Sequence, residues 1–237
     1  MKLEGKNPIR EVINSGNSIN KLYVLDGTTD SQIREWVKIA KANKVKVEWV
    51  DKKTLDKLSE TGHHQGIIAE TSEFDYTPLE DILSKDKDLL LILLDGLQDP
   101  HNLGSVIRVA ECANADAVVI PSRNSVLVNE TVIRVSAGAS AHMPVCRVGN
   151  LNSTIETLKK QGVWVFGADM DGEPMYNANL KGKIALVIGA EGSGLSPLTR
   201  KLCDQIVSIP MKGKVNSLNA SVSAGILVYE ALRQRSR

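Results

Sequence analysis

The pattern of hydrophobic and polar positions differs between the first 71 residues and the part of the chain after residue 88. After residue 88, apolar runs of four to six residues recur, and segments with a helical period separate most of them. The first run, Leu89 to Leu94, has no polar position, which is typical of a strand buried on both faces of a parallel sheet. Further strands are predicted at 117–120, 145–148, 163–167, 184–188 and 205–209. Strands that alternate with helices predict an α/β class with a mostly parallel, doubly wound sheet.

The first 71 residues form a smaller βα pattern of their own. Strands are predicted at 21–25, 45–50 and 67–70, with helices at 33–42 and 54–59. The longer helix has one apolar face, made of Ile33, Trp36, Val37 and Ala40. A polar stretch with Pro78 follows and is typical of a linker. We therefore predict a small N-terminal α/β domain at 1–72, a linker at 73–84 and a second domain at 85–237.

Charge and composition exclude few classes of protein. The 237 residues carry a net charge of +1, so the chain has no bulk attraction to nucleic acid. From Arg200 onwards, seven Lys and Arg residues face two acids, an excess that fits either a solvated helix with a basic tail or a local RNA contact. The longest apolar run is too short to span a membrane, and the first residues lack an apolar signal core. We expect a cytoplasmic protein.

Cysteine and histidine patterns do not favour a metal site. Cys112, Cys146 and Cys203 are widely spaced and lie in apolar runs, so reduced core residues are expected, with neither a disulfide nor a zinc site. The pair His63 and His64 has no nearby Cys or further His to complete a ligand set, and adjacent side chains point apart in an extended chain. A polar turn between two glycines is expected there, and contact with RNA is the alternative.

The last forty residues read as a strand, a loop and a helix. The strand at 205–209 ends at Pro210, through which a central strand cannot continue. Asn216 or Ser217 is expected to cap the following helix. The apolar side of that helix is expected to consist of Leu218, Val222, Ile226 and Tyr229, covering either the sheet or a second subunit. Polar side chains without a structural duty crowd its first turn, so a functional site is predicted there.

Two earlier strand–loop–helix junctions have similar features. In the first, Asp99 and Pro100 predict the start of a helix after the Leu89 to Leu94 strand. Gly104 costs about 1 kcal/mol inside that helix, which indicates a close approach by another helix or a ligand. Arg108 lies one turn further, where it is either a surface residue or an arginine aimed at phosphate or ribose.

The second junction is a glycine-rich turn, Gly189-Ala190-Glu191-Gly192-Ser193-Gly194, that follows a strand and precedes a helix starting at Ser196 and Pro197. Such a turn lets the backbone approach a ligand closely. It matches neither a P-loop nor the dinucleotide-binding fingerprint. Packing explains Glu191 poorly.

Together, the three junctions resemble the motifs of the SpoU family of RNA ribose 2'-O-methyltransferases, within the SPOUT superfamily. The matching segments are Asp99 to Gly104 with Arg108, then Gly189 to Ser196, then Ile209 to Met211 with Ser217 to Ser221. Gly5 to Pro8 and Gly62 to Gly66 resemble the substrate-binding domain of the bacterial 23S rRNA guanosine-2'-O-methyltransferase subgroup, a domain similar to small ribosomal RNA-binding proteins.

The resemblance implies a trefoil knot at the C-terminal end of the sheet, S-adenosylmethionine as cofactor, RNA as substrate and a site completed across a homodimer. It implies no metal. The implied cofactor-binding residues are Gly189, Ile209, Met211 and Leu218. The implied residues around the ribose and the reacting centre are Asn102, Arg108, Glu191, Ser217 and Asn219.

Three alternatives stay open at this stage. The RNA substrate could be a tRNA instead of rRNA. The N-terminal domain would also fit a non-catalytic, rRNA-binding ribosome-assembly factor. A nucleotide-dependent oxidoreductase is disfavoured, because the early glycine fingerprint and its acidic ribose partner are missing.

Overall fold

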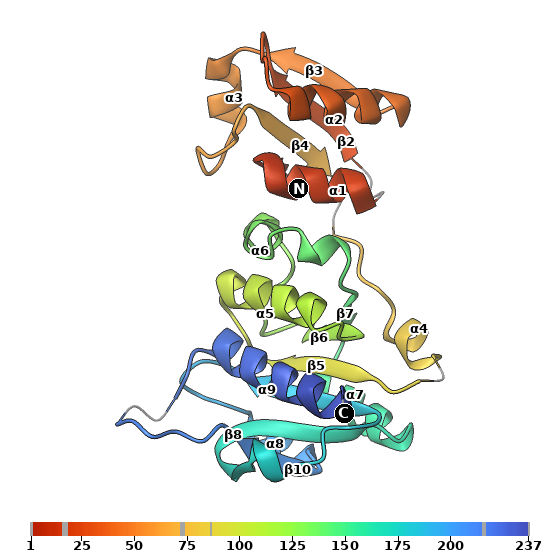
Figure 1. Cartoon of the computed structure of the whole chain (residues 1–237), viewed down its shortest axis with the longest axis vertical. Helices are drawn as coiled ribbons and strands as arrows, with labels where there is room; N and C mark the ends of the chain where they lie inside the picture. Colours follow the sequence, from red (N-terminus) through yellow and green to blue (C-terminus); the bar gives the residue numbers. More distant parts are fainter. Residues whose placement is uncertain (1, 16–18, 72–73, 86, 215–216, 237) are drawn as a thin grey trace. The chain divides into compact units, whose positions relative to one another are not determined.

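The structure is a computed structural model that describes residues 2–15, 19–71, 74–85, 87–214 and 217–236 (Figure 1). Its contacts divide the chain into two compact units. Residues 1–75 and 128–142 form the first unit, and residues 76–127 and 143–237 form the second. The predicted boundaries of the functional domains stay a prediction, because units of contact and units of function need not coincide. Among the described residues, no helix is long and apolar enough to cross a membrane.

The first unit contains a four-stranded mixed sheet in the order β1-β4-β2-β3. Its elements are β1 (Lys2–Glu4), α1 (Lys6–Ser15), β2 (Ile19–Leu25), α2 (Ser31–Ala42), β3 (Lys46–Val50), α3 (Lys52–Leu58) and β4 (Ile67–Thr71), joined later in the chain by α6 (Glu130–Val135) and the 3-10 turn η1 (Ala139–Ala141). The predicted apolar face of α2 is the buried one. Strand β1 was missed, because three residues show no period and pair only with the distant β4.

The loop that precedes β4 is fixed by two buried polar groups. The Glu4 carboxylate accepts hydrogen bonds from the Ser59 hydroxyl (2.6 Å), from the Thr61 hydroxyl (2.5 Å) and from the backbone N–H groups of residues 60 and 61. His64 is buried; its Nδ1 accepts from the Gly66 N–H, and its Nε2 lies 2.8 Å from an oxygen of Asp56. His64 thus has a structural role. No group of three or more metal-ligating side chains occurs within the described ranges.

The second unit is built on a six-stranded sheet in the order β10-β8-β9-β5-β6-β7, and all its neighbouring strands are parallel. The strands are β5 (Leu90–Asp95), β6 (Ala117–Pro121), β7 (Val145–Val148), β8 (Trp164–Pro174), β9 (Ile184–Gly189) and β10 (Gln205–Ser208). The helical segments are α4 (Leu79–Leu83), α5 (Pro100–Cys112), α7 (Leu151–Lys160), η2 (Met175–Asn177), α8 (Pro197–Leu202) and α9 (Ala220–Arg235). The predicted parallel α/β architecture is confirmed. The carboxyl ends of all six strands therefore lie at one edge of this sheet.

Helices cover both faces of this sheet, as the apolar run of β5 predicted. Leu91 and Leu93 of β5 belong to a core cluster with residues of α4, α7 and α8. The alternate residues Leu90, Ile92 and Leu94 face the other way and are also buried. Helices α5 and α9 pack side by side, and a Cβ added at Gly225 of α9 would lie 3.8 Å from the Val109 side chain of α5 (Figure 1).

Helix α9 differs from the prediction in its start and in its buried face. Its N-cap is Asn219, whose side-chain oxygen accepts from the N–H groups of Ser221 and Val222. Ser217 precedes the helix, so the predicted cap was wrong; Asn216 lies outside the described residues. The residues that α9 buries include Ala224, Leu227, Val228 and Ala231. The predicted apolar side does not cover the sheet, since Val222 and Tyr229 are 48% and 50% exposed.

Two basic residues near the end of α9 have structural partners. The Arg235 guanidinium donates to the carbonyl oxygens of Leu89 (2.8 Å), Gly182 (2.6 Å) and Leu180 (3.2 Å), and so holds α9 against the sheet. Arg233 pairs with Glu230. All three cysteines are free; burial raises the pKa of Cys146 to about 11 and that of Cys203 to about 12. Cys112 is exposed, so the expectation of a core position was wrong for it.

The hydrogen bonds of Glu4 predict a pH-dependent stability of the first unit. Burial raises the pKa of this carboxyl, but the donors on Ser59, Glu60 and Thr61 together lower it below its ordinary 4.5. Because the folded pKa is the lower one, the stabilisation is present above pH 4.5 and is lost as pH falls through the folded value. Glu4→Gln should destabilise this unit by about 1–3 kcal/mol at pH 7.

Hydrogen exchange at the amides of residues 60–62 measures this effect. We expect faster exchange in Glu4→Gln at neutral pH and a difference from the wild type that shrinks below pH 4.5. Glu35→Gln, at an exposed acid of α2 in the same unit, is the matched control. Equal exchange in both variants at pH 7 would contradict the role of Glu4.

Candidate functional site

The three junctions named from the sequence meet at the carboxyl edge of the parallel sheet. The first is the turn from β5 into α5, the second is the turn after β9, and the third is the loop between β10 and α9. Asp99 caps α5 with Pro100 in its first turn, and Ser196 caps α8 with Pro197, as predicted. Strand β5 pairs directly with β9, which brings the first two turns together. Ligands of open α/β sheets bind at this edge.

An amide–carboxylate cluster, made of Asn102, Glu191 and Asn219, joins the three junctions. Asn102 Nδ2 donates to Glu191 Oε1 at 3.0 Å. Asn219 Nδ2 donates to Asn102 Oδ1 at 2.9 Å and also to Glu191 Oε1. Asn102 and Glu191 are 89 positions apart along the chain, and Glu191 and Asn219 are 28 positions apart. The closing stretch therefore meets the two earlier junctions at the edge of the sheet.

Asn219 holds the cluster in place because its two side-chain ends have different tasks. Its oxygen accepts from the Ser221 N–H (2.9 Å), the Ser221 hydroxyl (2.6 Å) and the Val222 N–H (3.3 Å), which caps α9. Its amide nitrogen is thereby turned towards Asn102 and Glu191. The polar crowding at the start of α9 thus has a structural cause, which is to orient a donor towards the second junction.

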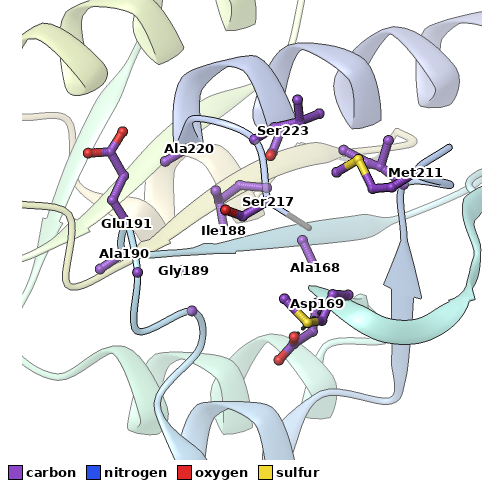
Figure 2. Close-up of a pocket in the computed structure, with 15 residues that line it drawn as sticks. Ala168, Asp169, Ile188, Gly189, Ala190, Glu191, Met211, Ser217, Ala220 and Ser223 are labelled. Carbon is purple, nitrogen blue, oxygen red and sulfur yellow. Dashed lines mark hydrogen bonds between the residues drawn. The ribbon is translucent and has the colours of Figure 1, made fainter. Parts of the chain in front are cut away.

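A pocket opens beside this cluster (Figure 2). In that view Glu191 lies at one end of the pocket and Met211 at the other, with Ser217 between them. All four residues that the resemblance implied for cofactor binding line the pocket: Gly189, Ile209, Met211 and Leu218. Glu191 and Ser217 line it as well. The roles of these residues stay a prediction.

Gly189 is required by the backbone of the glycine-rich turn. A Cβ at this position would lie 2.2 Å from the backbone carbon of Gly194, because the turn folds back over it. The return is closed by two hydrogen bonds, from the N–H of Ala190 to the Gly194 oxygen (3.1 Å) and from the N–H of Gly194 to the Ala190 oxygen (3.0 Å). Gly192 and Gly194 have positive φ values of 80° and 65°, which favour glycine. The turn therefore presents backbone atoms to the pocket.

One wall of the pocket was not predicted from the sequence. Residues 168–172 of β8, here called the 168–172 bulge, leave the ladder with β10: Ile206 pairs with Gly167, and the next residue, Val207, pairs with Glu173. The bulge carries Ala168, Asp169 and Met170 into the pocket lining. Glycines at both ends permit it. A Cβ at Gly172 would lie 2.7 Å from the Ile206 backbone, and one at Gly167 would lie 2.8 Å from the side chains of Cys203 and Leu195.

Arg200 of α8 holds the 168–172 bulge. Its Nη2 atom contacts both oxygens of Asp171, at 2.9 and 3.0 Å, and its Nη1 pairs with Asp169. Asp169 also accepts from the Met170 N–H at 2.7 Å. The only signal in the sequence is a pair of acids between Gly167 and Gly172. No local pattern links these acids to Arg200, which lies in α8.

Arg108 does not join the amide–carboxylate cluster. It is exposed on α5, and among the described residues it has no hydrogen-bond or ion-pair partner. Six helical positions separate it from Asn102, which corresponds to about 9 Å along the axis and roughly 120° around it. The single chain therefore brings together four of the five residues implied around the reacting centre, since Ser217 lines the pocket beside the cluster, and leaves the arginine apart.

The pocket suits S-adenosylmethionine, the cofactor that the resemblance implied. Small residues (Ala168, Gly189, Ala190 and Ala220) leave room next to the backbone, and the apolar side chains of Ile188, Ile209 and Leu218 can cover an adenine ring. The Glu191 carboxylate has no ion-pair partner among the described residues and suits a ligand that carries positive charge on sulfur and on an amino group.

Removing the Arg200 guanidinium should loosen the wall of this pocket, because Asp169 and Asp171 would then repel each other. We expect Arg200→Gln to raise the Kd for S-adenosylmethionine by about 3–10-fold, measured by calorimetry on the purified chain. Lys201→Gln, at the exposed neighbouring cation of α8, is the control. Unchanged affinity in Arg200→Gln, with intact folding, would contradict this role of the ion pairs.

Comparison with known proteins identifies the family. Residues 89–229 match the SpoU rRNA Methylase family, and residues 2–77 match the RNA 2'-O ribose methyltransferase substrate binding domain. The chain is 42% identical over 237 residues to a putative TrmH family tRNA/rRNA methyltransferase of Staphylococcus saprophyticus, covering 98% of this chain and 95% of the relative. It is 40% identical to the putative TrmH family tRNA/rRNA methyltransferase YacO of Bacillus subtilis, with the same coverage.

Solved structures support the same family. The SpoU methyltransferase AviRb from Streptomyces viridochromogenes matches 100% of this chain and 90% of its own, with a TM-score of 0.85 and 26% identity. AviRb in complex with its cofactor AdoMet matches 99% of this chain and 89% of its own, with a TM-score of 0.82 and 26% identity. The two matched domains cover residues 2–77 and 89–229, and the three motif junctions build one pocket at the sheet edge. The chain therefore belongs to the SpoU (TrmH-type) family of RNA methyltransferases, which use S-adenosylmethionine as methyl donor.

Proposed function

We propose that this enzyme transfers a methyl group from S-adenosylmethionine to the ribose 2'-hydroxyl of a guanosine in 23S rRNA, in the cytoplasm. The observation that carries the proposal is the amide–carboxylate cluster beside the pocket, because it unites the three junctions that resemble SpoU motifs. The match of residues 2–77 to a ribose methyltransferase substrate-binding domain supports an RNA substrate. The choice of 23S rRNA and of guanosine rests on the resemblance alone.

The bound cofactor would supply an activated methyl group on a sulfonium, so the protein has to align the two reactants. Glu191 Oε1 is occupied by the amides of Asn102 and Asn219. Its other oxygen has no donor among the described residues, so it is free to accept from a ligand. The Ser217 side chain lines the pocket and would position the ribose by a hydrogen bond. The acceptor of the hydroxyl proton stays open.

Arg108 is the proposed partner of the ribose and its neighbouring phosphate. An arginine stays protonated, so its contribution is to orient the RNA and to stabilise the developing alkoxide, not to remove a proton. Because Arg108 lies about 9 Å along α5 from Asn102, we propose that it acts on the site of a second subunit. The exposed apolar residues Val222 and Tyr229 on the neighbouring helix α9 support a homodimer with this surface at its interface.

The direct test of the function is transfer of a radiolabelled methyl group to unmodified rRNA and tRNA transcripts, followed by mass spectrometry of the nucleosides. The proposal expects 2'-O-methylguanosine in 23S rRNA. Label only in tRNA would favour a tRNA methyltransferase. RNA binding without any transfer would favour a ribosome-assembly factor, and label on a base would contradict ribose methylation.

Mixing two inactive variants tests the shared site. Arg108→Ala removes the guanidinium, and Asn219→Asp keeps the oxygen that caps α9 but loses the donor to Glu191. Each alone should lower the rate of methyl transfer by about 100-fold or more. After the two are mixed and their subunits exchange, half of the dimers are mixed and carry one intact site, so about a quarter of wild-type activity should return.

The control is a mixture of each inactive variant with Lys181→Ala, an exposed side chain of the second unit. In these mixtures a site is active when both its Arg108 and its Asn219 are wild-type. The activity should therefore match the value calculated for random pairing of the two kinds of subunit. If mixing Arg108→Ala with Asn219→Asp restores no activity although the subunits exchange, Arg108 acts within its own subunit.

A further inference from the structure

A second cavity lies at the carboxyl edge of the same sheet, on the far side of β5 from the cofactor pocket. It measures about 320 Å³, and we call it the Arg123 cavity. Its lining comes from the ends of β5, β6 and β7 and from the first turn of α7: Asp95, Gly96, Pro121, Arg123, Asn124, Gly149, Asn150, Leu151 and Asn152. None of these residues has a role in the chemistry described above.

The loop that carries Arg123 is fixed to the first motif junction. The Val126 N–H and the Ser125 hydroxyl both donate to the Leu97 carbonyl, at 2.8 and 3.1 Å. The Gln98 amide donates to the Asn124 carbonyl at 2.8 Å. At the start of the loop, the Ser122 N–H donates to the Val148 carbonyl at 2.8 Å. Arg123 and Asn124 are therefore held at a defined place beside β5 and β7.

Three side-chain acceptors of the cavity are engaged by the protein, and only Asp95 Oδ1 and Asn124 Oδ1 have no donor among the described residues, whereas several donors are free. Asn150 Oδ1 accepts from the Ser153 N–H (3.0 Å), and Asn152 Oδ1 accepts from the Thr199 hydroxyl (2.9 Å). Asp95 Oδ2 accepts from the Ser196 N–H (2.7 Å). The Arg123 guanidinium and the side-chain amide nitrogens of Asn150 and Asn152 have no partner among the described residues. Such a lining suits a ligand that is rich in acceptors and negatively charged.

We propose that the Arg123 cavity binds a phosphate of the RNA strand whose ribose is methylated in the neighbouring pocket. The proposal rests on the proposed function for the identity of the strand. Strands β9 and β6 flank β5, so the two sites are about 10 Å apart at the sheet edge, within reach of neighbouring nucleotides. With a net charge of only +1, the chain needs local donors of this kind to hold RNA.

The test compares Arg123→Gln with Lys160→Gln, at an exposed cation in the last turn of α7, the helix whose first turn lines the cavity. Binding of an unmodified 23S rRNA transcript is measured at several salt concentrations. Arg123→Gln should raise the Kd by about 3–10-fold and reduce the slope of log K against log salt by about 0.7. Lys160→Gln should change neither quantity. Equal RNA binding in both variants overturns the proposal.

A second variant adds charge without removing a contact. A Cβ at Gly149 has no neighbour within 4 Å, so Gly149→Asp should fold and place a carboxylate at the cavity. It should weaken RNA binding at least as much as Arg123→Gln, while the Kd for S-adenosylmethionine stays at the wild-type value in both. Wild-type RNA affinity in Gly149→Asp overturns the proposal.

Failure of the proposed function is distinguishable from failure of the cavity. If the wild-type chain binds S-adenosylmethionine but no RNA, the function fails, and inorganic phosphate is titrated while the amide resonances of residues 149–152 are followed by NMR. Resonance shifts that occur in the wild type but not in Arg123→Gln would support an anion-binding site in the cavity, with free phosphate as its ligand. No shift at millimolar phosphate overturns the site as well.

Discussion

The site depends on the hydrogen bonds that Asn219 makes in two directions. One end of its amide caps α9, and the other reaches Asn102 and Glu191. Asn102 is the buried member of the cluster, whereas Glu191 and Asn219 are exposed. A buried amide is costly unless it is hydrogen-bonded, and here Glu191 accepts from its nitrogen while Asn219 donates to its oxygen. The cluster thereby ties the loop after β10 to the turns after β5 and β9. If the donor on Asn219 were lost, Glu191 would keep only the hydrogen bond from Asn102.

A second constraint is the close approach of backbone to backbone around the pocket. Gly189 and Gly172 stand where any side chain would collide with main-chain atoms. The first allows the glycine-rich turn to fold over itself, and the second allows the 168–172 bulge to return to β8. Arg200 then fixes the bulge from α8. The walls of the pocket are therefore set by main-chain geometry, while a few polar side chains supply charge and orientation.

Much of the second unit could be predicted from the sequence, because buried parallel strands and amphipathic helices leave local patterns. The helix starts at Asp99 and Ser196 are confirmed. The start of α9 was missed because several cap-forming residues compete there, and only the contacts of Asn219 with distant residues select one. The buried face of α9 was missed for a related reason: it is made of alanines as well as larger residues, and Val222 and Tyr229 on the predicted side are left exposed.

Features that depend on pairing between distant segments gave no local signal. Strand β1 has three residues and becomes a strand only through β4. The 168–172 bulge needs β10 and α8, and the structural role of His64 needs Asp56 and Gly66. The trefoil knot came from the resemblance, since threaded connections are rare in proteins. It stays a prediction, because residues 215 and 216 of the β10–α9 loop lie outside the described residues.

The central claim is that the amide–carboxylate cluster couples the three junctions to cofactor binding. A double-mutant cycle on the Kd for S-adenosylmethionine tests it, with Asn102→Ala, Glu191→Ala and the double variant. Asn102 does not line the pocket, so its effect should pass through Glu191. We predict that Asn102→Ala weakens binding in the wild-type background but adds almost nothing to Glu191→Ala, with a coupling energy of about 0.5–3 kcal/mol. Additive effects of the two substitutions would contradict the account.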